Sequence, residues 1–268
     1  MLLSVSPMLL AYILVLTIIL GGAMGSFAAC MASRLVSGET FLYGRSHCDS
    51  CGHDLTGRDL IPILSWVILK GKCRWCKNKI SPRSSLIELL CALAFVGLII
   101  RYDISFVTLQ YMILTVLLLT VSLVDYDTGL IPDGLLVAMI ITWIVFIPIV
   151  HHGQIQASLI QGIFGAILAS VPLLILTLVM DRVLQKESMG GGDIKLFFAV
   201  GLFFSWQSVL FLLILSCLLG ILFGICFNKR FKDKKNPQAF PFGPAIGVGV
   251  YLSLFIAEPV MGLYLNLF

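Results

Sequence analysis

Two aspartates of this chain stand where long apolar segments meet short polar ones. Asp125 follows the apolar run that begins at Ile104, and it opens the segment Asp125-Tyr-Asp-Thr-Gly-Leu-Ile-Pro-Asp133. Asp193 closes the sequence Gly190-Gly-Gly-Asp193 and precedes another apolar run. Acidic side chains next to hydrocarbon are costly, and by default they mark a functional site. Two carboxyl groups brought together can share one proton, which is what acid–base hydrolysis of an amide requires.

The composition predicts the medium in which these acids lie. Of the 268 residues, 59% are apolar and 12% are charged, whereas a soluble domain is about one quarter charged. Apolar runs of roughly 17–25 residues can cross a bilayer as helices. The candidate runs cover residues 8–30, 85–100, 104–124, 134–150, 158–180, 194–227 and 240–267. Because Ser205-Trp-Gln207 interrupts the run 194–227, we divide it into two short spans. The sequence therefore predicts an all-α, polytopic membrane protein of about eight transmembrane helices.

Basic residues predict how the spans are oriented. They gather in residues 31–84, before Asp193 and after the seventh predicted span, and basic loops stay in the cytoplasm. Both termini are then outside, and both aspartates lie at the cytoplasmic boundary. The formal net charge of +4 follows from this topology and suggests no nucleic-acid partner. These basic residues are Arg34, Arg45, Arg58, Lys70, Lys72, Arg74, Lys77, Lys79, Arg83, Arg182, Lys186, Lys229, Arg230, Lys232, Lys234 and Lys235.

Each acid also has a plain structural explanation. Asp193 could be the N-cap of the next helix, because Asp is favoured there. Asp133 follows Pro132 and has the position of a helix start, and Asp127 lies further into the polar segment, where water solvates it. Asp125 is nearest the apolar boundary, where desolvation perturbs a carboxyl group most. Two acids on one membrane face favour Asp125 and Asp193 as a catalytic pair.

Residues 31–84 form the one long polar stretch and hold two C-x-x-C pairs, Cys48-Asp-Ser-Cys51 and Cys73-Arg-Trp-Cys76. Each pair can place two thiolates on one cation, and four thiolates complete a tetrahedral zinc site. A segment this short builds little core, so a structural Zn²⁺ would supply folding energy. Disulfides or a redox pair are the alternatives, but a reducing cytoplasm and the doubled pairs favour zinc.

Two other charged residues have open roles. Lys195, two residues past Asp193, either snorkels to the interface or tunes the acidic pair or binds a substrate carboxylate, and snorkelling is favoured. Glu88 pairs with Arg83 or with a polar group of the bundle, or it contacts the basic part of a substrate. The sequence does not decide between these roles of Glu88.

Taken together, the chain resembles the type IV prepilin peptidases, a family of bifunctional leader peptidases and N-methyltransferases. The first C-x-x-C pair reads Cys-Asp-Ser-Cys where many members have Cys-Pro-x-Cys, which leaves the ligands intact. The matching motifs follow one another over nearly the whole chain: Gly25-Ser-Phe27, the paired C-x-x-C module around Ile61-Pro-Ile-Leu-Ser-Trp66, Ile80-Ser-Pro-Arg83, Glu88, the Asp125 and Asp193 segments, and Pro241-Phe-Gly-Pro244.

The resemblance implies an aspartic peptidase of the Gly-x-Gly-Asp type in the bacterial cytoplasmic membrane, with Asp125 and Asp193 as its catalytic pair. It implies that prepilins or pseudopilins are cut on the cytoplasmic side and then N-methylated by S-adenosylmethionine, whose binding residues stay unassigned. It also links the zinc module to methylation. The expected domains are a first span (1–30), a cytoplasmic zinc-binding insert (31–84) and a membrane-embedded peptidase core (85–268).

Three alternatives stay open. One is a peptidase-only relative without methyltransferase activity. Another is an ion-coupled transporter, since intramembrane carboxylates also serve proton relays, although transport sites tend to lie near the midplane of the bilayer. The third is a non-catalytic zinc-bearing scaffold of a secretion machine, which would leave Asp125 and Asp193 without a role.

Overall fold

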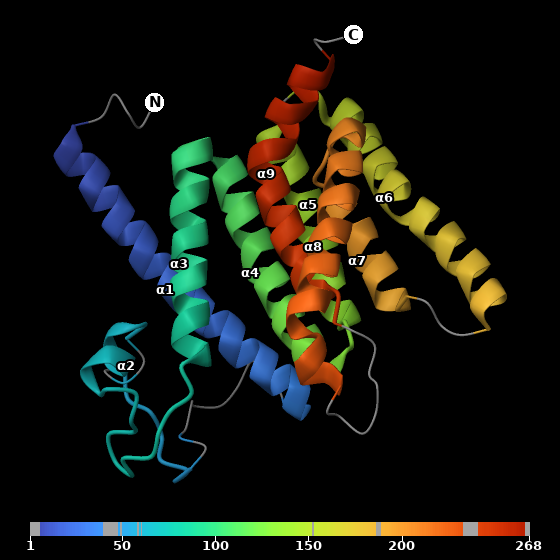
Figure 1. The fold of residues 1–268 in the computed structure, drawn as a ribbon. Coiled ribbons are helices and arrows are strands. Elements are labelled where there is room, and N and C mark those ends of the chain that lie inside the picture. The colour runs from blue at the N-terminus through green and yellow to red at the C-terminus, as the bar shows by residue number, and fades with distance from the viewer. Residues whose placement is uncertain are drawn as a thin grey trace. The chain divides into compact units, whose positions relative to one another are not determined.

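The computed structural model describes residues 6–39, 48, 50–57, 59, 61–151, 153–185, 189–232 and 241–265. Within this part of the chain the regular elements are helices (Figure 1), which confirms the all-α prediction. Several basic residues on which the predicted orientation depends lie outside the described residues: Arg45, Arg58, Lys186, Lys234 and Lys235. The helices are α1 (Pro7–Ser37), α2 (Leu64–Ile68), α3 (Arg83–Tyr102), α4 (Phe106–Thr128), α5 (Asp133–Val150), α6 (Ile155–Leu184), α7 (Gly191–Gly201), α8 (Trp206–Lys232) and α9 (Gly243–Leu265).

Six of the described helices are long and apolar enough to cross a membrane, namely α1, α3, α4, α5, α6 and α8. The run 194–227 is indeed divided, because α7 ends at Gly201 and α8 begins at Trp206. However, α7 has 11 residues and is about 16 Å long, whereas the hydrocarbon core is about 30 Å thick. The predicted count of about eight spans is therefore not confirmed.

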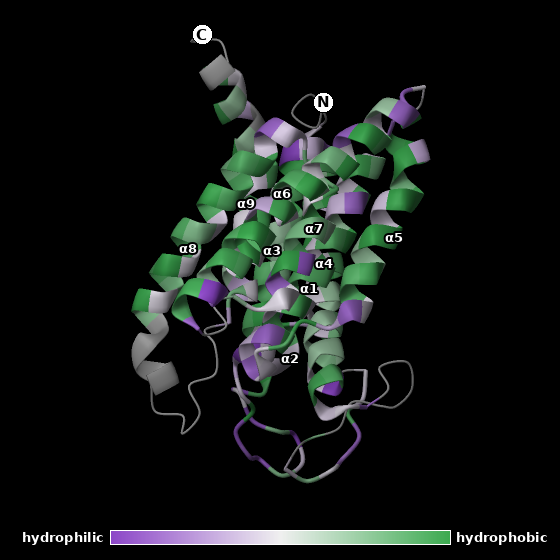
Figure 2. Cartoon of the chain, turned by 90° about the vertical axis from the view of Figure 1, so that its right-hand side faces the viewer, coloured by the Kyte–Doolittle hydropathy of each residue, from purple (hydrophilic) through white to green (hydrophobic). Residues whose placement is uncertain are grey.

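The apolar faces of these helices point outward, as expected in lipid. Figure 2 shows mostly hydrophobic residues along the coloured parts of α5 and α8, and many hydrophilic residues in the segment around α2. Ile175 on α6 is 57% exposed, and Ile214 on α8 is 62% exposed. Large apolar side chains exposed in such numbers along a helix indicate contact with lipid.

Contacts divide the chain into two compact units, Met1–Thr120 and Val121–Phe268. In the first unit α1 packs directly on α3. A Cβ atom on Gly21 would lie 2.6 Å from Cα of Ala92, and one on Gly25 would lie 2.7 Å from Cα of Glu88. These two glycines, four residues apart, therefore allow the backbones of the two helices to touch, as small residues do in membrane helix pairs.

In the second unit the short helix α7 lies among longer ones. It packs against α5, α6 and α9, and its side chains Leu196, Phe197 and Val200 are fully buried. A Cβ atom on Gly201 would lie 2.8 Å from Cα of Ala166 on α6, so this end of α7 is held closely. The residue at the other end of α7, Asp193, is thus mounted on a well-packed element.

Candidate active site and cysteine cluster

Asp125 lies within α4, one turn before its end. The sequence predicted that the polar segment begins at this residue, but α4 continues to Thr128. Gly129 then adopts a φ of +69°, and its N–H donates to the carbonyl oxygen of Asp125 at 2.7 Å. A glycine in this left-handed conformation is a common helix stop. Asp125 is therefore a helical residue, and it is only 4% exposed.

The backbone of α9 holds the Asp125 carboxylate. The N–H of Gly243, the first residue of α9, donates to Oδ2 of Asp125 at 2.7 Å. The first N–H groups of a helix have no partner inside the helix, so a buried carboxylate satisfies one of them. A Cβ atom on Gly243 would lie 2.7 Å from the same oxygen, so only glycine allows this approach.

Gly243 is a site residue that the sequence analysis missed. Its segment, Pro241-Phe-Gly-Pro244, was named only as one of the motifs that carry the family resemblance. The available signal was a glycine placed one residue before a proline at a helix start, where the backbone is fixed and a side chain is absent. Nothing in the pattern names Asp125 as the partner.

Asp193 lies in the first turn of α7, outside the six helices that are long enough to span. The N-cap of α7 is Gly190, and no side chain caps this end. Asp193 is therefore not the N-cap that the structural alternative requires. Burial, and after it the charge of Asp125, raises the pKa of the Asp193 carboxyl to about 7. The two acids thus interact electrostatically inside the second unit, and together they favour a state that holds one proton.

The four cysteines of the two C-x-x-C pairs form one cluster. Their Sγ atoms all lie within 4.8 Å of one another, and those of Cys48 and Cys76 are 3.9 Å apart. Four thiolates about 2.3 Å from a tetrahedral zinc ion have sulfur atoms about 3.8 Å apart. All four thiols are free of disulfide bonds. The donor set and its spacing therefore fit a four-coordinate metal ion.

Comparison with known proteins identifies the family. The model of the bacterial peptidase A24 N-terminal domain matches residues 19–102, which include the four cysteines, and that of the type IV leader peptidase family matches residues 112–225, which include both aspartates. A relative from Aeromonas salmonicida (strain A449), "Prepilin leader peptidase/N-methyltransferase", is 32% identical over 83% of this chain and 75% of its own length. The chain belongs to the type IV leader peptidase family.

Other similar proteins carry the same name as the Aeromonas relative. A relative of the same name from Pseudomonas aeruginosa is 31% identical over 82% of this chain and 74% of its own length. One from Bacillus subtilis (strain 168) is 29% identical over 93% of this chain and 96% of its own length. No solved structure matches. Family membership and the six long apolar helices make this leader peptidase a multi-pass protein of the cell membrane.

Asp127 and Asp133, the other acids considered for the catalytic role, have surroundings that differ from those of Asp125 and Asp193. Asp127 is half-buried, and two residues along a helix it faces about 200° away from Asp125. Asp133 is the first residue of α5, with Pro132 at the N-cap. Its Oδ1 lies 2.8 Å from Nζ of Lys195, and both side chains are largely exposed. The Lys195 ammonium is therefore at the surface, and it pairs with Asp133.

Glu88 forms its hydrogen bond with the backbone of the insert (residues 31–84). It is 7% exposed, and its Oε2 accepts the N–H of Ile63 at 2.7 Å. Ile63 immediately precedes α2 and has a φ of +62°, a conformation that branched residues rarely adopt. Of the roles considered for Glu88, a polar contact within the protein is the one observed, and it fastens the insert to α3.

Proposed function

We propose that this leader peptidase cleaves the leader peptides of type IV prepilins or pseudopilins on the cytoplasmic side of the membrane, with Asp125 and Asp193 as its catalytic pair, and that it N-methylates the new N-terminal residue. The observation that carries the proposal is the proximity of the buried Asp125, near the end of α4, to the half-buried Asp193 in the first turn of α7, close enough for the charge of one to raise the pKa of the other. The names of the relatives include both activities.

The geometry supports water-mediated hydrolysis. Oδ2 of Asp125 is held by the N–H of Gly243, which leaves Oδ1 to take a proton from an attacking water. Asp193, whose pKa is raised, holds the shared proton and polarises the carbonyl oxygen of the scissile bond. The water oxygen bonds to the carbonyl carbon, the C–N bond breaks, and a proton passes to the leaving amine. Neither a covalent intermediate nor a catalytic metal takes part.

The second activity transfers a methyl group to the amine that cleavage releases. S-adenosylmethionine supplies an electrophilic methyl group, and the amine must be unprotonated to accept it. The reaction can be tested with purified enzyme and a full-length prepilin in liposomes, with and without S-adenosylmethionine. Mass spectrometry of the pilin N-terminus should show loss of the leader in both samples and a gain of one methyl group only when the donor is present. An intact leader in both samples would contradict the proposal.

We further propose that Cys48, Cys51, Cys73 and Cys76 hold one structural Zn²⁺ per chain. Elemental analysis of the purified enzyme should then give about one zinc per chain. Cys73→Ser should lower the zinc content to near zero, because three thiolates hold the ion much more weakly. Cys217→Ser is the matched control, since this thiol is exposed on α8 and outside the cluster. Active, fully folded enzyme without metal would contradict the zinc assignment.

Substitution of a cysteine should impair methylation more than cleavage, because the cysteines belong to the first compact unit and the aspartates to the second. Cys76→Ser should loosen the insert, and we expect N-methylation of mature pilin to fall at least about ten-fold, since even changes around metal ligands cost about 10–100-fold. Leader cleavage should fall much less. Both values come from one mass spectrum of the pilin N-terminus. An equal fall of both activities would show that the insert shapes the peptidase site.

A further inference from the structure

A cavity lined by apolar side chains and by several polar and charged ones lies between the insert and the start of α3, within the first unit. Its volume is about 120 Å³, which is room for about four water molecules at roughly 30 Å³ each. Leader cleavage, as derived above, uses none of its residues. Its charged and polar lining includes Ser26, Asp59, Trp66, Arg74, Ser85 and Glu88.

One wall of the cavity carries the buried carboxylate of Glu88, which can accept further hydrogen bonds. Glu88 is 7% exposed, and its Oε2 accepts the N–H of Ile63. Among the residues that the structure describes, Oε1 of Glu88 has no hydrogen-bond partner. A buried carboxylate is costly unless charges or donors surround it. The free oxygen therefore favours a cationic N–H donor inside the cavity.

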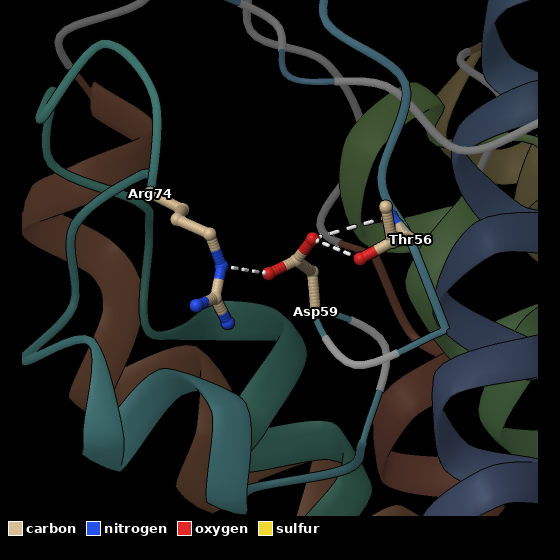
Figure 3. Close-up of polar contacts among 3 residues, drawn as sticks. All are labelled: Thr56, Asp59 and Arg74. Atoms are coloured by element: carbon tan, nitrogen blue, oxygen red, sulfur yellow. Dashed lines mark hydrogen bonds and ion pairs between the residues drawn. The ribbon is translucent and has the colours of Figure 1, made fainter.

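A second wall of the cavity carries the guanidinium of Arg74, which contacts Asp59 through its Nε. Oδ1 of Asp59 lies 2.7 Å from Nε of Arg74, and Oδ2 accepts hydrogen bonds from the hydroxyl and N–H of Thr56 (Figure 3). These bonds, that of the Thr56 hydroxyl first, hold the pKa of Asp59 below its ordinary value. The terminal nitrogens of Arg74 point away from Asp59 (Figure 3). The Arg74 side chain is 45% exposed, and a guanidinium oriented in this way can bind a carboxylate with both terminal nitrogens.

We propose that this cavity binds the α-amino-acid end of S-adenosylmethionine, with Glu88 on the α-ammonium group and Arg74 on the α-carboxylate. The inference rests on the proposed methyltransferase activity. Asp59 is already bound to Arg74 and Thr56, so the groups left for a ligand are one carboxylate oxygen of Glu88 and the terminal nitrogens of Arg74, which together suit a zwitterion. The half-buried ring of Trp66 also lines the cavity, and aromatic rings attract cations such as a sulfonium ion. The amino terminus of a peptide has no neighbouring carboxylate and would leave Arg74 unmatched.

The test compares two nucleosides that differ only at the amino-acid end. S-adenosylhomocysteine has this end, and 5′-methylthioadenosine lacks it. Calorimetry on purified full-length enzyme in detergent should show S-adenosylhomocysteine binding at least about ten-fold more tightly, as expected for charge-assisted hydrogen bonds. Glu88→Gln and Arg74→Gln should each remove most of this preference and leave the affinity for 5′-methylthioadenosine unchanged. Glu88→Gln keeps an oxygen for the N–H of Ile63, so the insert stays attached.

Glu39→Gln is the matched control, because Glu39 is exposed and does not line the cavity; it should keep the full preference. A preference that survives in both cavity variants would overturn the proposal. So would an equal loss of affinity for both nucleosides in the cavity variants, because Glu88 and Arg74 would then not distinguish the amino-acid end. Wild-type enzyme that cleaves prepilin but binds neither nucleoside would instead refute the methyltransferase activity itself.

Discussion

Asp125→Asn and Asp193→Asn are each expected to lower the rate of leader cleavage by about 1,000-fold or more, the scale of losing an acid–base group that acts in the transition state. Asparagine has nearly the shape of aspartate, but it neither takes a proton from water nor donates one to a carbonyl oxygen at neutral pH. At Asp125 it can still accept the N–H of Gly243. Initial rates on prepilin in liposomes measure the effect, and an unchanged thermal unfolding temperature of the purified variants would show that the protein is folded.

Asp127→Asn is the control for Asp125→Asn, because it makes the same change two residues along α4. The Asp127 side chain is half-buried and faces another direction on the helix, so cleavage should fall by less than about ten-fold, as for a group outside the proton transfer. An inactive Asp127 variant next to an active Asp125 variant would reverse the assignment.

Gly243→Ala should lower kcat/KM for cleavage by about 100-fold, because a displacement of the order of 1 Å at a catalytic group costs about that much. The new methyl group would lie 2.7 Å from Oδ2 of Asp125 and 3.0 Å from its Cβ. Either α9 or the carboxylate must then move, and the hydrogen bond that fixes the carboxylate is lost.

The matched control is Gly134→Ala in the first turn of α5. A Cβ atom there meets no atom within 4 Å, and alanine favours a helix over glycine by about 1 kcal/mol. Activity should stay at the wild-type level. Near-normal cleavage by Gly243→Ala would show that the Gly243 contact does not position Asp125.

The pattern of residue types predicted the parts of this fold that local chemistry determines. Apolar runs gave the helices, and Ser205 marked the break between α7 and α8. The doubled C-x-x-C spacing predicted a four-sulfur cluster, because two turns with a common cation leave few other arrangements. The end of α4 was misplaced because the polarity of Asp125 was taken as the helix end, whereas Gly129 determines it.

Long-range contacts could not be predicted in this way. The bond between Gly243 and Asp125 joins residues 118 positions apart, and its donor is a backbone N–H that every residue except proline has. The hydrogen bond between Glu88 and Ile63 likewise has a backbone N–H as its donor. The span count of about eight is not confirmed, because neighbouring helices bury α7 and so allow a helix too short to cross the bilayer to be stable.

The most direct test of the central claim, that Asp125 and Asp193 perform the hydrolysis, is mass spectrometry of the pilin N-terminus with two substrates. Purified Asp125→Asn and Asp193→Asn enzymes are incubated with S-adenosylmethionine and either full-length prepilin or already mature pilin. We expect the prepilin to keep its leader while the mature pilin gains one methyl group, which shows a folded enzyme that has lost hydrolysis alone. Removal of the leader by either variant at a rate near that of the wild type would contradict the claim.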